Sequence, residues 1–567
     1  MRKIFTGVLL SVVVSSSAFA EPESPDTNVR ITKEGVWYSV SRDETLSTIS
    51  LKFTGEISHW RAIGKTNSIE NDRTIPIGKK IWIPARLLTP VSTFAKIRSF
   101  FGRVAIRSSD GTNIEPKIGA QLKEGDTLTT PADSFVSLVL DDGTQFTLPP
   151  DSSLNLRLLR KTQYIQSPRT ELYLQKGRVE SQVTPFTKPD SRFEVLSPLA
   201  VSGVRGTNFR VNYDDKRVFN EVIEGKVSVQ PDAAKRKSAG QLVAAGYGTV
   251  VENGQARKPV PLLAAPVLAD GYQNQERLPI HFSLAQPQAA AFRVRISTDL
   301  AGENNIAEAV AAANDGKAMP KVGDLEDGDY FVHYNAVDAN GLSGIRNTLR
   351  FRVAARPFPP FLQAPGARYQ GTGTDQLIPV IMQWSQVDGI SRYRLQIAGD
   401  PAFGSPLVDQ AIDTAGQDQG RHVAQLKAGT YYWRVASIVS TNGTSRQGPF
   451  GDAKKVDVIK SQSAPAVTLG EKDIHFTWSG SEGQHFTFQA ADTSSFDKPF
   501  VSIETAQPEV AIPRPDAGIY YARVRSIDAD GFVGSFSPAQ KFVVPIYWQT
   551  GYGVPLRSQD QPLGTGF

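Results

Sequence analysis

The sequence predicts a mainly β, multi-domain protein in which a small N-terminal module holds the helices. Its 567 residues exceed what one hydrophobic core normally supports, so several domains are expected. From about residue 100 onwards, short alternating apolar runs are separated by turn residues, which is typical of β-sandwiches and related all-β folds. Near the C-terminus one strand pattern occurs three times, as in tandem domains.

The composition is that of an ordinary globular chain, with 40% apolar and 21% charged residues. There is no cysteine, which excludes disulfides and thiolate metal sites. The net charge of +5 is spread along the chain without a basic cluster interleaved with aromatic residues, so we expect no nucleic-acid partner. The six histidines lack metal-ligand spacing, and no catalytic or cofactor-binding motif is found. We therefore expect no enzyme activity, no metal and no cofactor.

Residues 1–20 have the pattern of a signal peptide. Arg2 and Lys3 precede an apolar run, and small residues ending in Ala18-Phe19-Ala20 follow it. The alternative, a membrane anchor, is disfavoured because the run is too short for a spanning helix. We expect cleavage after Ala20, a periplasmic location and no membrane insertion of the mature chain. Residues 21–34 are polar and contain prolines, so they are expected to form a flexible tether.

Residues 35–86 predict a strand, two helices and a second strand. Residues 37–40 alternate as a strand does, and the apolar residues of the first helix fall on one face, with Asp43 placed to cap its start. A second helical piece is expected over residues 57–65, and residues 75–84 alternate in a closing strand. The residues expected in the core include Leu46, Ile49 and Ile81.

This order of elements resembles the LysM peptidoglycan-binding module. The resemblance rests on Tyr38-Ser-Val40, Thr45-Leu46, Asn67 and the run from Ile77-Gly78 to Pro84. It implies a shallow groove for N-acetylglucosamine-containing glycans of peptidoglycan, formed by the loop before the first helix and the loop before the second strand. The groove residues that it implies are Asp43, Glu44, Thr45, Asn67, Ile69, Thr74 and Ile75.

The chain departs from this family at Asp43-Glu44-Thr45, where LysM modules usually have Gly-Asp-Thr. Glycine lets a ligand approach the backbone closely, and Asp43 removes that freedom. A weakened or altered glycan site, or a LysM fold kept for docking another protein, is therefore the alternative. Residues 87–99 are expected to be a linker.

Residues 100–258 are expected to form an all-β domain of short strands and tight turns. Asp141 and Asp142 precede Gly143, and we interpret them as a turn between two strands rather than as a catalytic pair. The stretch Val201–Phe209 contains Gly203 and Gly206, which permit a bend or bulge between two strands.

Six blocks of this region, in order, resemble the FecR-type domain of the periplasmic ferric-citrate regulator family. The blocks are residues 122–128, 132–143, 174–179, 193–201, 203–209 and 222–227. The resemblance implies a non-catalytic domain that occurs in sigma-factor regulators and in larger envelope proteins. Those regulators carry a transmembrane helix that we do not find here, so sigma-factor signalling is not carried over. Arg205, between the two glycines, is a candidate partner contact, and a plain edge-strand arginine is the alternative.

Three tandem β-sandwiches are expected over residues 262–356, 357–460 and 464–545. Each contains a strand that opens with a tyrosine after a turn, at Tyr330, Tyr431 and Tyr520. The set resembles fibronectin type III or related immunoglobulin-like domains, in which such a tyrosine-corner hydroxyl bonds to backbone. Residues 546–567 are expected to be a tail that docks on the last sandwich or captures a partner.

Together these modules predict a non-catalytic periplasmic scaffold that binds peptidoglycan and presents its FecR-type and sandwich domains to an unknown envelope protein. The alternative is an envelope signal sensor or regulator that acts through the FecR-type domain. A wall-remodelling enzyme with an unrecognised site is a third, less favoured hypothesis. The pattern identifies neither the protein partner nor the oligomeric state.

Overall fold

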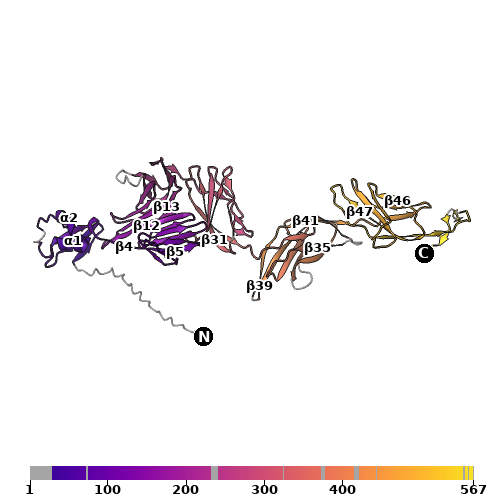
Figure 1. Ribbon diagram of the computed structural model, residues 1–567, viewed down its shortest axis with the longest axis horizontal. Helices are drawn as coiled ribbons and strands as arrows, with labels where there is room; N and C mark the ends of the chain where they lie inside the picture. Colours follow the sequence, from indigo (N-terminus) through magenta and orange to yellow (C-terminus); the bar gives the residue numbers. More distant parts are fainter. Residues whose placement is uncertain are drawn as a thin grey trace, which may run out of the picture. The chain divides into compact units, whose positions relative to one another are not determined.

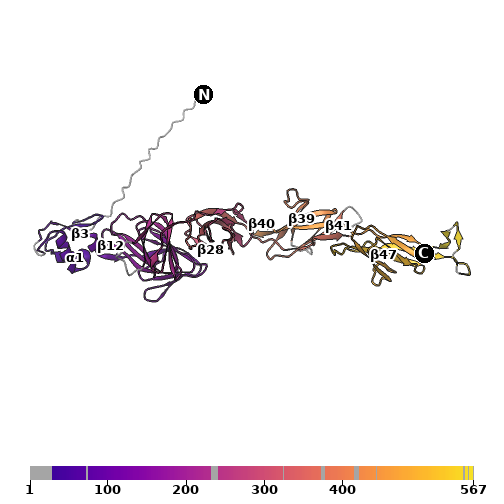
Figure 2. The ribbon, with the colours of Figure 1, turned by 90° about the horizontal axis from the view of Figure 1, so that it is seen from above.

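The computed structural model describes residues 28–567 except 72–74, 232–239, 324, 372–376, 414–419, 442, 553, 555, 560 and 566–567. The expected signal peptide, residues 1–20, therefore lies outside the described residues. The chain forms two compact units, residues 1–353 and 354–567. Strands make up nearly all of the regular structure, and the helices are confined to the indigo N-terminal module (Figures 1 and 2), which confirms the predicted fold class. None of the described helices is long and apolar enough to cross a membrane.

The N-terminal module is a three-stranded antiparallel sheet, in the order β1-β2-β3, packed against two short helices (Figure 1). Its elements are β1 (Val29–Ile31), β2 (Gly35–Ser39), α1 (Leu46–Thr54), the 3-10 turn η1 (Ile57–His59), α2 (Trp60–Thr66), β3 (Lys80–Pro84) and the 3-10 turn η2 (Ala85–Leu87). Leu46, Ile49 and Ile81 are fully buried, as predicted.

Strand β1 lies inside residues 21–34, where the sequence predicted a flexible tether. Val29 pairs with Tyr38 and Ile31 pairs with Val36, so the segment extends the sheet by one edge strand. Three alternating residues within a polar stretch are too few to predict a strand from the sequence.

Helix α1 is capped by Thr45, and not by Asp43 as expected. The Thr45 hydroxyl accepts a hydrogen bond from the Thr48 backbone N–H, and the Thr48 hydroxyl accepts one from the Thr45 N–H. This reciprocal capping box satisfies two N–H groups at the helix start. Gly55, with a φ of 71°, ends the helix in the left-handed conformation.

The central β domain is a network of nineteen hydrogen-bonded strands. They are β4 (Pro90–Ser92), β5 (Ala95–Phe101), β6 (Ala105–Arg107), β7 (Asn113–Ile114), β8 (Gln121–Leu122), β9 (Thr127–Thr130), β10 (Phe135–Leu140), β11 (Gln145–Leu148), β12 (Ser152–Thr162), β13 (Pro168–Gln182), β14 (Arg192–Leu196), β15 (Ala200–Val204), β16 (Asn208–Tyr213), β17 (Arg217–Glu224), β18 (Lys226–Pro231), β19 (Gln241–Ala244), β20 (Tyr247–Glu252), β21 (Gln255–Ala256) and β22 (Val260–Pro261).

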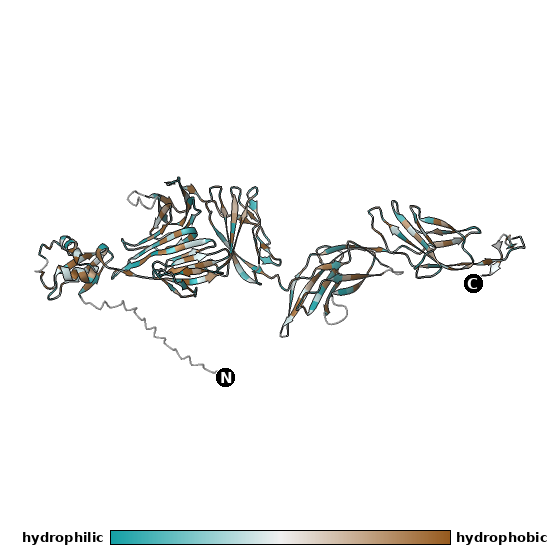
Figure 3. Ribbon diagram, viewed as in Figure 1, coloured by the Kyte–Doolittle hydropathy of each residue, from teal (hydrophilic) through white to brown (hydrophobic). Residues whose placement is uncertain are grey.

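Alternating side chains of these strands fill one continuous core, and the alternation of brown and teal residues is visible in Figure 3. Residues 87–99 were predicted to be a linker, but Leu87 and Leu88 pack in the core of the N-terminal module and the rest of the segment belongs to the central domain. Strands β4 and β5 pair with β12 and β10, and Ala95 and Ile97 are buried in the core. The sequence predicted a connector here because the segment is short and contains Pro90.

The stretch Val201–Phe209 is the predicted pair of strands joined by a turn, β15 and β16. Gly206 has a φ of 91°, and a Cβ there would lie 2.4 Å from the Pro185 Cα, so only glycine fits this turn. The Thr207 hydroxyl donates to the Lys226 carbonyl of β18, and Phe209 is buried in the core.

The hairpin between β12 and β13 reaches back to the N-terminal module. Ile165 is buried in that module's core, and the Tyr164 ring lies 5.2 Å from the ring of Phe53. The Gln163 backbone N–H donates to the Thr89 carbonyl. The module's core is therefore completed by a side chain of the next domain.

The first sandwich packs a five-stranded sheet, β24-β32-β31-β27-β28, against two small sheets. Its strands are β23 (Val267–Leu268), β24 (Asn274–Gln275), β25 (Ile280–His281), β26 (Leu284–Ala285), β27 (Ala291–Ser297), β28 (Asn305–Ala312), β29 (Lys317–Ala318), β30 (Lys321–Val322), β31 (Gly328–Val337) and β32 (Asn347–Val353).

The second unit holds two further sandwiches and the tail. The second sandwich has β33 (Leu362–Ala364), β34 (Arg368–Gly371), β35 (Ile378–Trp384), β36 (Arg392–Ala398), β37 (Val408–Asp413), β38 (Arg421–Leu426), β39 (Gly429–Thr441), β40 (Thr444–Phe450) and β41 (Lys454–Lys460). The third has β42 (Ala466–Leu469), β43 (Asp473–Thr477), β44 (His485–Ala491), β45 (Val501–Thr505), β46 (Glu509–Pro513), β47 (Gly518–Ile527) and β48 (Gln540–Val544). The tail has β49 (Ile546–Tyr547), β50 (Arg557–Ser558), β51 (Gln561–Pro562) and β52 (Gly564–Thr565).

Each sandwich has the predicted tyrosine corner. The hydroxyls of Tyr330, Tyr431 and Tyr520 donate to the carbonyls of Glu326, Lys427 and Asp516, at 3.0, 3.1 and 2.9 Å. In every case the acceptor lies four residues before the tyrosine, so the ring fixes the turn that enters the strand.

Candidate functional sites

In the N-terminal module, two loops meet at the position where a glycan groove was predicted. The Val40 N–H donates to the Lys79 carbonyl at 3.0 Å, and the Gly78 N–H donates to the Val40 carbonyl at 2.8 Å. These bonds fix the turn that precedes β3 beside the loop of residues 41–45. The segments that flank the two predicted rims, Val40 and the turn at Gly78 and Lys79, are therefore adjacent.

Three of the predicted groove residues use their polar atoms to hold the rims. Glu44 accepts hydrogen bonds from the Tyr38 hydroxyl and the Ser41 N–H, each at 2.8 Å. Thr45 caps α1. Asn67 donates to the carbonyls of Ile63 and Trp82 and accepts from the Trp82 N–H at 2.7 Å. Asn67 thus ties the end of α2 to β3.

The remaining groove residues differ in exposure. Asp43 is exposed and has a φ of 63°, the left-handed conformation that glycine adopts without strain. Ile69 and Ile75 are half-buried and pack on the core, and Thr74 lies outside the described residues. Ile77, between the rims and β3, is 66% exposed. Sequence reasoning did not include Ile77 in the groove, although an isoleucine in a turn beside Gly78 is a usable signal.

A second solvent-facing feature of this module is an aromatic pair. Trp37 of β2 and Trp82 of β3 are cross-strand partners with ring centroids 5.1 Å apart. They lie on the sheet face opposite Tyr38 and Ile81, which point into the core. Trp37 is 39% exposed.

Arg205 borders a hollow of the central domain with a volume of about 420 Å³. Arg192 and Lys226 also line it, together with Gly203 and one carboxylate, Glu194. The Arg205 guanidinium donates to the Pro189 carbonyl at 2.8 Å and remains exposed. The hollow is positively charged and shallow, as suits contact with an acidic group on a partner.

The central domain and the first sandwich are joined by buried charges that the sequence did not reveal. Arg295 of β27 donates to both carboxylate oxygens of Glu180 on β13, and it also donates to Glu308 of β28. Arg178 of β13 donates to Glu308 at 2.6 Å. Arg295 is 4% exposed, and Glu308 has a side chain that is 10% exposed. The two domains therefore share one charge network.

A neighbouring contact continues this interface. Glu221 accepts a hydrogen bond from the Ser343 N–H, and Arg210 donates to the carbonyls of Ser343 and Gly344. Phe219 of β17 packs with Leu342 in a small apolar cluster. The turn after β31 is consequently held by β16 and β17 of the central domain.

The charged groups in this interface shift one another's pKa values. Burial of the Glu180 carboxyl opposes its charge, but Arg295, Arg346 and Arg210 outweigh burial and hold its pKa well below the usual range. The pKa of Glu221 is raised, because burial outweighs the nearby Arg210. Glu180 is therefore the carboxylate that this site keeps ionised.

His333 of β31 lies beside the same network. Its ring nitrogens bond to the hydroxyls of Ser297 and Thr348 at 2.7 and 2.8 Å. Burial, followed by the charges of Arg346 and Arg295, lowers its pKa to about 3. The imidazole is thus neutral and fully hydrogen-bonded at neutral pH, a structural role.

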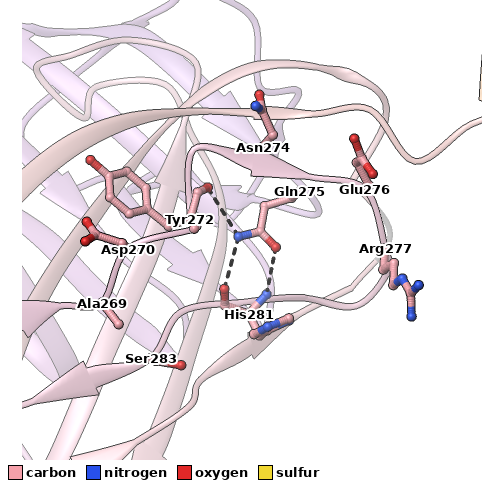
Figure 4. A pocket seen from close by; sticks show the side chains of 10 residues that line it. Ala269, Asp270, Tyr272, Asn274, Gln275, Glu276, Arg277, His281 and Ser283 are labelled. Atoms are coloured by element: carbon pink, nitrogen blue, oxygen red, sulfur yellow. Dashed lines mark hydrogen bonds between the residues drawn. The ribbon is translucent and has the colours of Figure 1, made fainter. Parts of the chain in front are cut away.

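The first sandwich also has a polar cavity of about 250 Å³, shown in Figure 4. Gln275 spans its wall, donating to the carbonyls of Tyr272 and His281. Asp270, Glu276 and Arg277 line its rim. Within the described part of the chain, no group of three or more His, Asp or Glu side chains is arranged to hold a metal ion.

Comparisons with known proteins agree with these modules. The family model of the LysM domain matches residues 38–84, and that of the FecR protein family matches residues 126–228. Domains of both families are generally binding or signalling domains and occur in envelope-associated proteins. No curated protein sequence matches the chain.

Among solved structures, two of a candidate anti-sigma factor from Parabacteroides distasonis ATCC 8503 are 17% and 19% identical, with TM-scores of 0.20 and 0.19. They match 24% of this chain, which spans 59% of theirs. The FN1–FN3 domains of chicken CNTN1 are 13% identical over 49% of this chain and 97% of that chain, with a TM-score of 0.20. The chain thus has a LysM match and a FecR match in its N-terminal part, followed by three β-sandwiches.

Proposed function

We propose that this protein is a non-catalytic periplasmic scaffold, which binds peptidoglycan through its LysM domain and presents its β domains to an envelope protein. The observation that carries the proposal is the adjacency of the two LysM loops, residues 41–45 and the turn before β3, within the matched domain. LysM domains generally bind peptidoglycan. Backbone bonds between Val40 and the turn at Gly78 and Lys79 hold these two segments together before a ligand arrives, which reduces the ordering cost of binding.

The proposed location is supported by residues 1–20, whose charged start, apolar run and Ala18-Phe19-Ala20 ending fit a cleaved signal peptide. Expression of the full chain in a Gram-negative host tests it. We expect release with the periplasmic fraction and a mature N-terminus at Glu21. Recovery in the cytosol with Met1 intact would overturn the location.

Buried contact between the LysM domain and the β12–β13 hairpin affects how the groove should be tested. Removing the whole module would expose Ile165, so its deletion would perturb the FecR-type domain as well. A single substitution in the groove avoids this problem. Ile77 is suited to it because its side chain is exposed and it is not a member of the buried core of the module.

The experiment is cosedimentation of the mature protein with purified sacculi. We expect Ile77→Glu to reduce retention at least tenfold, because it places a charge on the rim where the sugar ring must approach. Leu51→Glu is the matched control: Leu51 is 52% exposed on α1, outside both rims, and should leave retention unchanged. Failure of the wild-type protein to cosediment with sacculi would sink the wall-binding role, and equal retention of wild type and Ile77→Glu would sink the assignment of the groove. Soluble fragments released from the sacculi would sink the non-catalytic role.

A regulatory role through the FecR-type domain is the second candidate. The observation that favours it is the cationic hollow bordered by Arg205, which belongs to the matched FecR-type region. If the hollow receives a signalling partner, then Arg205→Glu should abolish crosslinking to that partner in the native envelope while sacculus retention is unchanged. Identical crosslinks for the variant and wild type would rule out this use of the hollow.

A further inference from the structure

The three sandwiches share one outward sheet face, and the structure shows what covers it in the first of them. The residues of this face are cross-strand partners at equivalent positions: Arg295 with His333, Gln396 with Arg434, and Gln489 with Arg523. In the first sandwich the face is closed by the FecR-type domain, whose Glu180 accepts two hydrogen bonds from Arg295. Among the described residues of the second unit, no carboxylate of another domain pairs with the corresponding face of the later sandwiches.

The turn that follows β27, β36 and β44 has one equivalent position at which the three sandwiches differ. Gly302, Phe403 and Phe496 occupy one position of this turn, each with a positive φ, of 75°, 57° and 55°. A Cβ on Gly302 would lie 3.0 Å from the His333 ring. Glycine leaves room for the His333 ring in the first sandwich, whereas phenylalanine covers the neighbouring arginine in the other two.

In the second sandwich the face carries its own acid. Arg434 lies between the rings of Phe403 and Phe450, at 4.0 and 4.4 Å from the ring centroids. Asp409, the strand partner of Gln396, accepts two hydrogen bonds from Arg394, each at 2.7 Å. Charge on this face is therefore largely balanced within the domain.

The third sandwich has arginines on this face, like the second, but no acid at the position that corresponds to Asp409. Arg523 lies between Phe496 and Phe536, 4.1 and 4.0 Å from the ring centroids, and donates twice to Gln489. Arg525 lies 4.8 Å from the Phe536 centroid. The two guanidinium groups are thus held side by side on one rigid aromatic support.

The strand register shows which residue of the third sandwich takes the place of the acid. Glu308 faces Arg295 and Asp409 faces Gln396, but the residue that faces Gln489 is Ser502. Glu504, further along the same strand, is exposed and faces Thr487. Burial and the charge of Arg525 lower the pKa of Arg523, and no carboxylate among the described residues opposes this shift.

We propose that the β44–β47 face of the third sandwich binds an acidic segment of a protein partner, whose carboxylate occupies the place opposite Gln489 and pairs with Arg523 and Arg525. The Glu180–Arg295 pair shows this mode of docking within the same chain. A preorganised arginine favours a carboxylate because it offers paired N–H donors. This inference does not depend on the LysM groove.

The test uses the full mature chain and a fluorescein-labelled synthetic peptide in which Glu and Thr alternate over eight residues, so that its carboxylates share one strand face. Fluorescence anisotropy should show saturable binding that weakens with salt. Ser502→Glu supplies the acid that the other sandwiches have, and we expect it to weaken binding at least tenfold. Ser502→Gln, similar in size and uncharged, should bind like wild type, and Arg525→Gln should bind more weakly.

Several outcomes would overturn the proposal. One is equal affinity of the Ser502→Glu variant and wild type for the peptide. Another is equally tight binding of inorganic polyphosphate, which would make the face a general anion site. A loss of sacculus retention in Ser502→Glu would assign the face to the cell wall instead of a protein. An alternating Lys-Thr peptide that binds as well would exclude charge recognition.

Discussion

Arg295 of the first sandwich and Glu180 of the FecR-type domain form a bidentate ion pair, with N–O distances of 3.1 and 2.7 Å. Arg295 is buried, the Glu180 side chain is 20% exposed, and Glu308, Arg178 and Arg346 extend the pair. A buried ion pair gains little over an apolar contact of the same shape, but it is costly to break on one side only. The pair therefore favours the one arrangement of the two domains in which Glu180 lies opposite Arg295.

Glu180→Ala should consequently destabilise the docked pair of domains by about 3–5 kcal/mol, because it leaves Arg295 buried without its main partner. Differential scanning calorimetry of the full chain should show one transition moved to lower temperature, and limited proteolysis should open the region between β22 and β23. Glu115→Ala is the control, since the Glu115–Lys117 pair is exposed and should contribute nothing measurable. An unchanged transition temperature in Glu180→Ala would contradict this role of the ion pair.

A second prediction concerns Asp43, where the LysM pattern usually has glycine. Its φ of 63° shows that the backbone keeps the glycine-like conformation. Asp43→Gly should therefore relieve strain, raise the free energy of unfolding by about 0.5–1 kcal/mol and clear the rim for a glycan. We expect tighter retention on sacculi, measured beside thermal unfolding of the variant.

Asn67→Ala is the contrasting variant for the same groove. It removes three hydrogen bonds to the backbone of Ile63 and Trp82, so it should destabilise the LysM domain and lose sacculus binding only together with the fold. If Asp43→Gly binds sacculi more weakly than wild type, then the aspartate side chain contacts the glycan directly and the strain argument is wrong.

The sequence predicted most of the fold because the signals were local. Alternating runs, turn glycines and the repeated Tyr330, Tyr431 and Tyr520 each depend on a few neighbouring residues. The strands at Pro90 and Ala95 were missed because each pairs with a distant segment, and that pairing, not the local pattern, makes them strands. The strand at Val29 pairs with the neighbouring strand at Tyr38 and was missed because only three of its residues alternate.

The candidate sites were less predictable for the same reason. Thr45 and Asn67 could be placed in the LysM groove by motif, but their bonding to the α1 start and to β3 became visible only in three dimensions. Glu180 and Arg295 are far apart in sequence and sit in unremarkable strands. A charged residue at an outward strand position looks like solvated surface until another domain covers it.

The last prediction is a pH dependence centred on His333. Its folded pKa of about 3 lies below the unfolded value near 6.5, so the fold favours the neutral imidazole. The stability that this contributes is complete above pH 6.5 and is lost as the pH falls from 6.5 towards 3. Between pH 6.5 and 4.5 the loss amounts to at most about 2.7 kcal/mol. Below about pH 4.5, protonation of Glu180, whose folded pKa is depressed, adds to it.

Charged and polar groups from every element around His333 enter this balance: Arg295, Arg346, Asp299, Glu180, Ser297 and Thr348. Glu221 acts in the opposite direction, because its raised pKa makes protonation favourable in the fold. His333→Gln keeps a polar group near Ser297 and should flatten the fall in stability between pH 6.5 and 4.5. His475→Gln, at a side chain that is 54% exposed, should leave it unchanged. Urea unfolding at pH 7, 6 and 5 measures both variants, and an unaltered slope in His333→Gln would show that another group senses the proton.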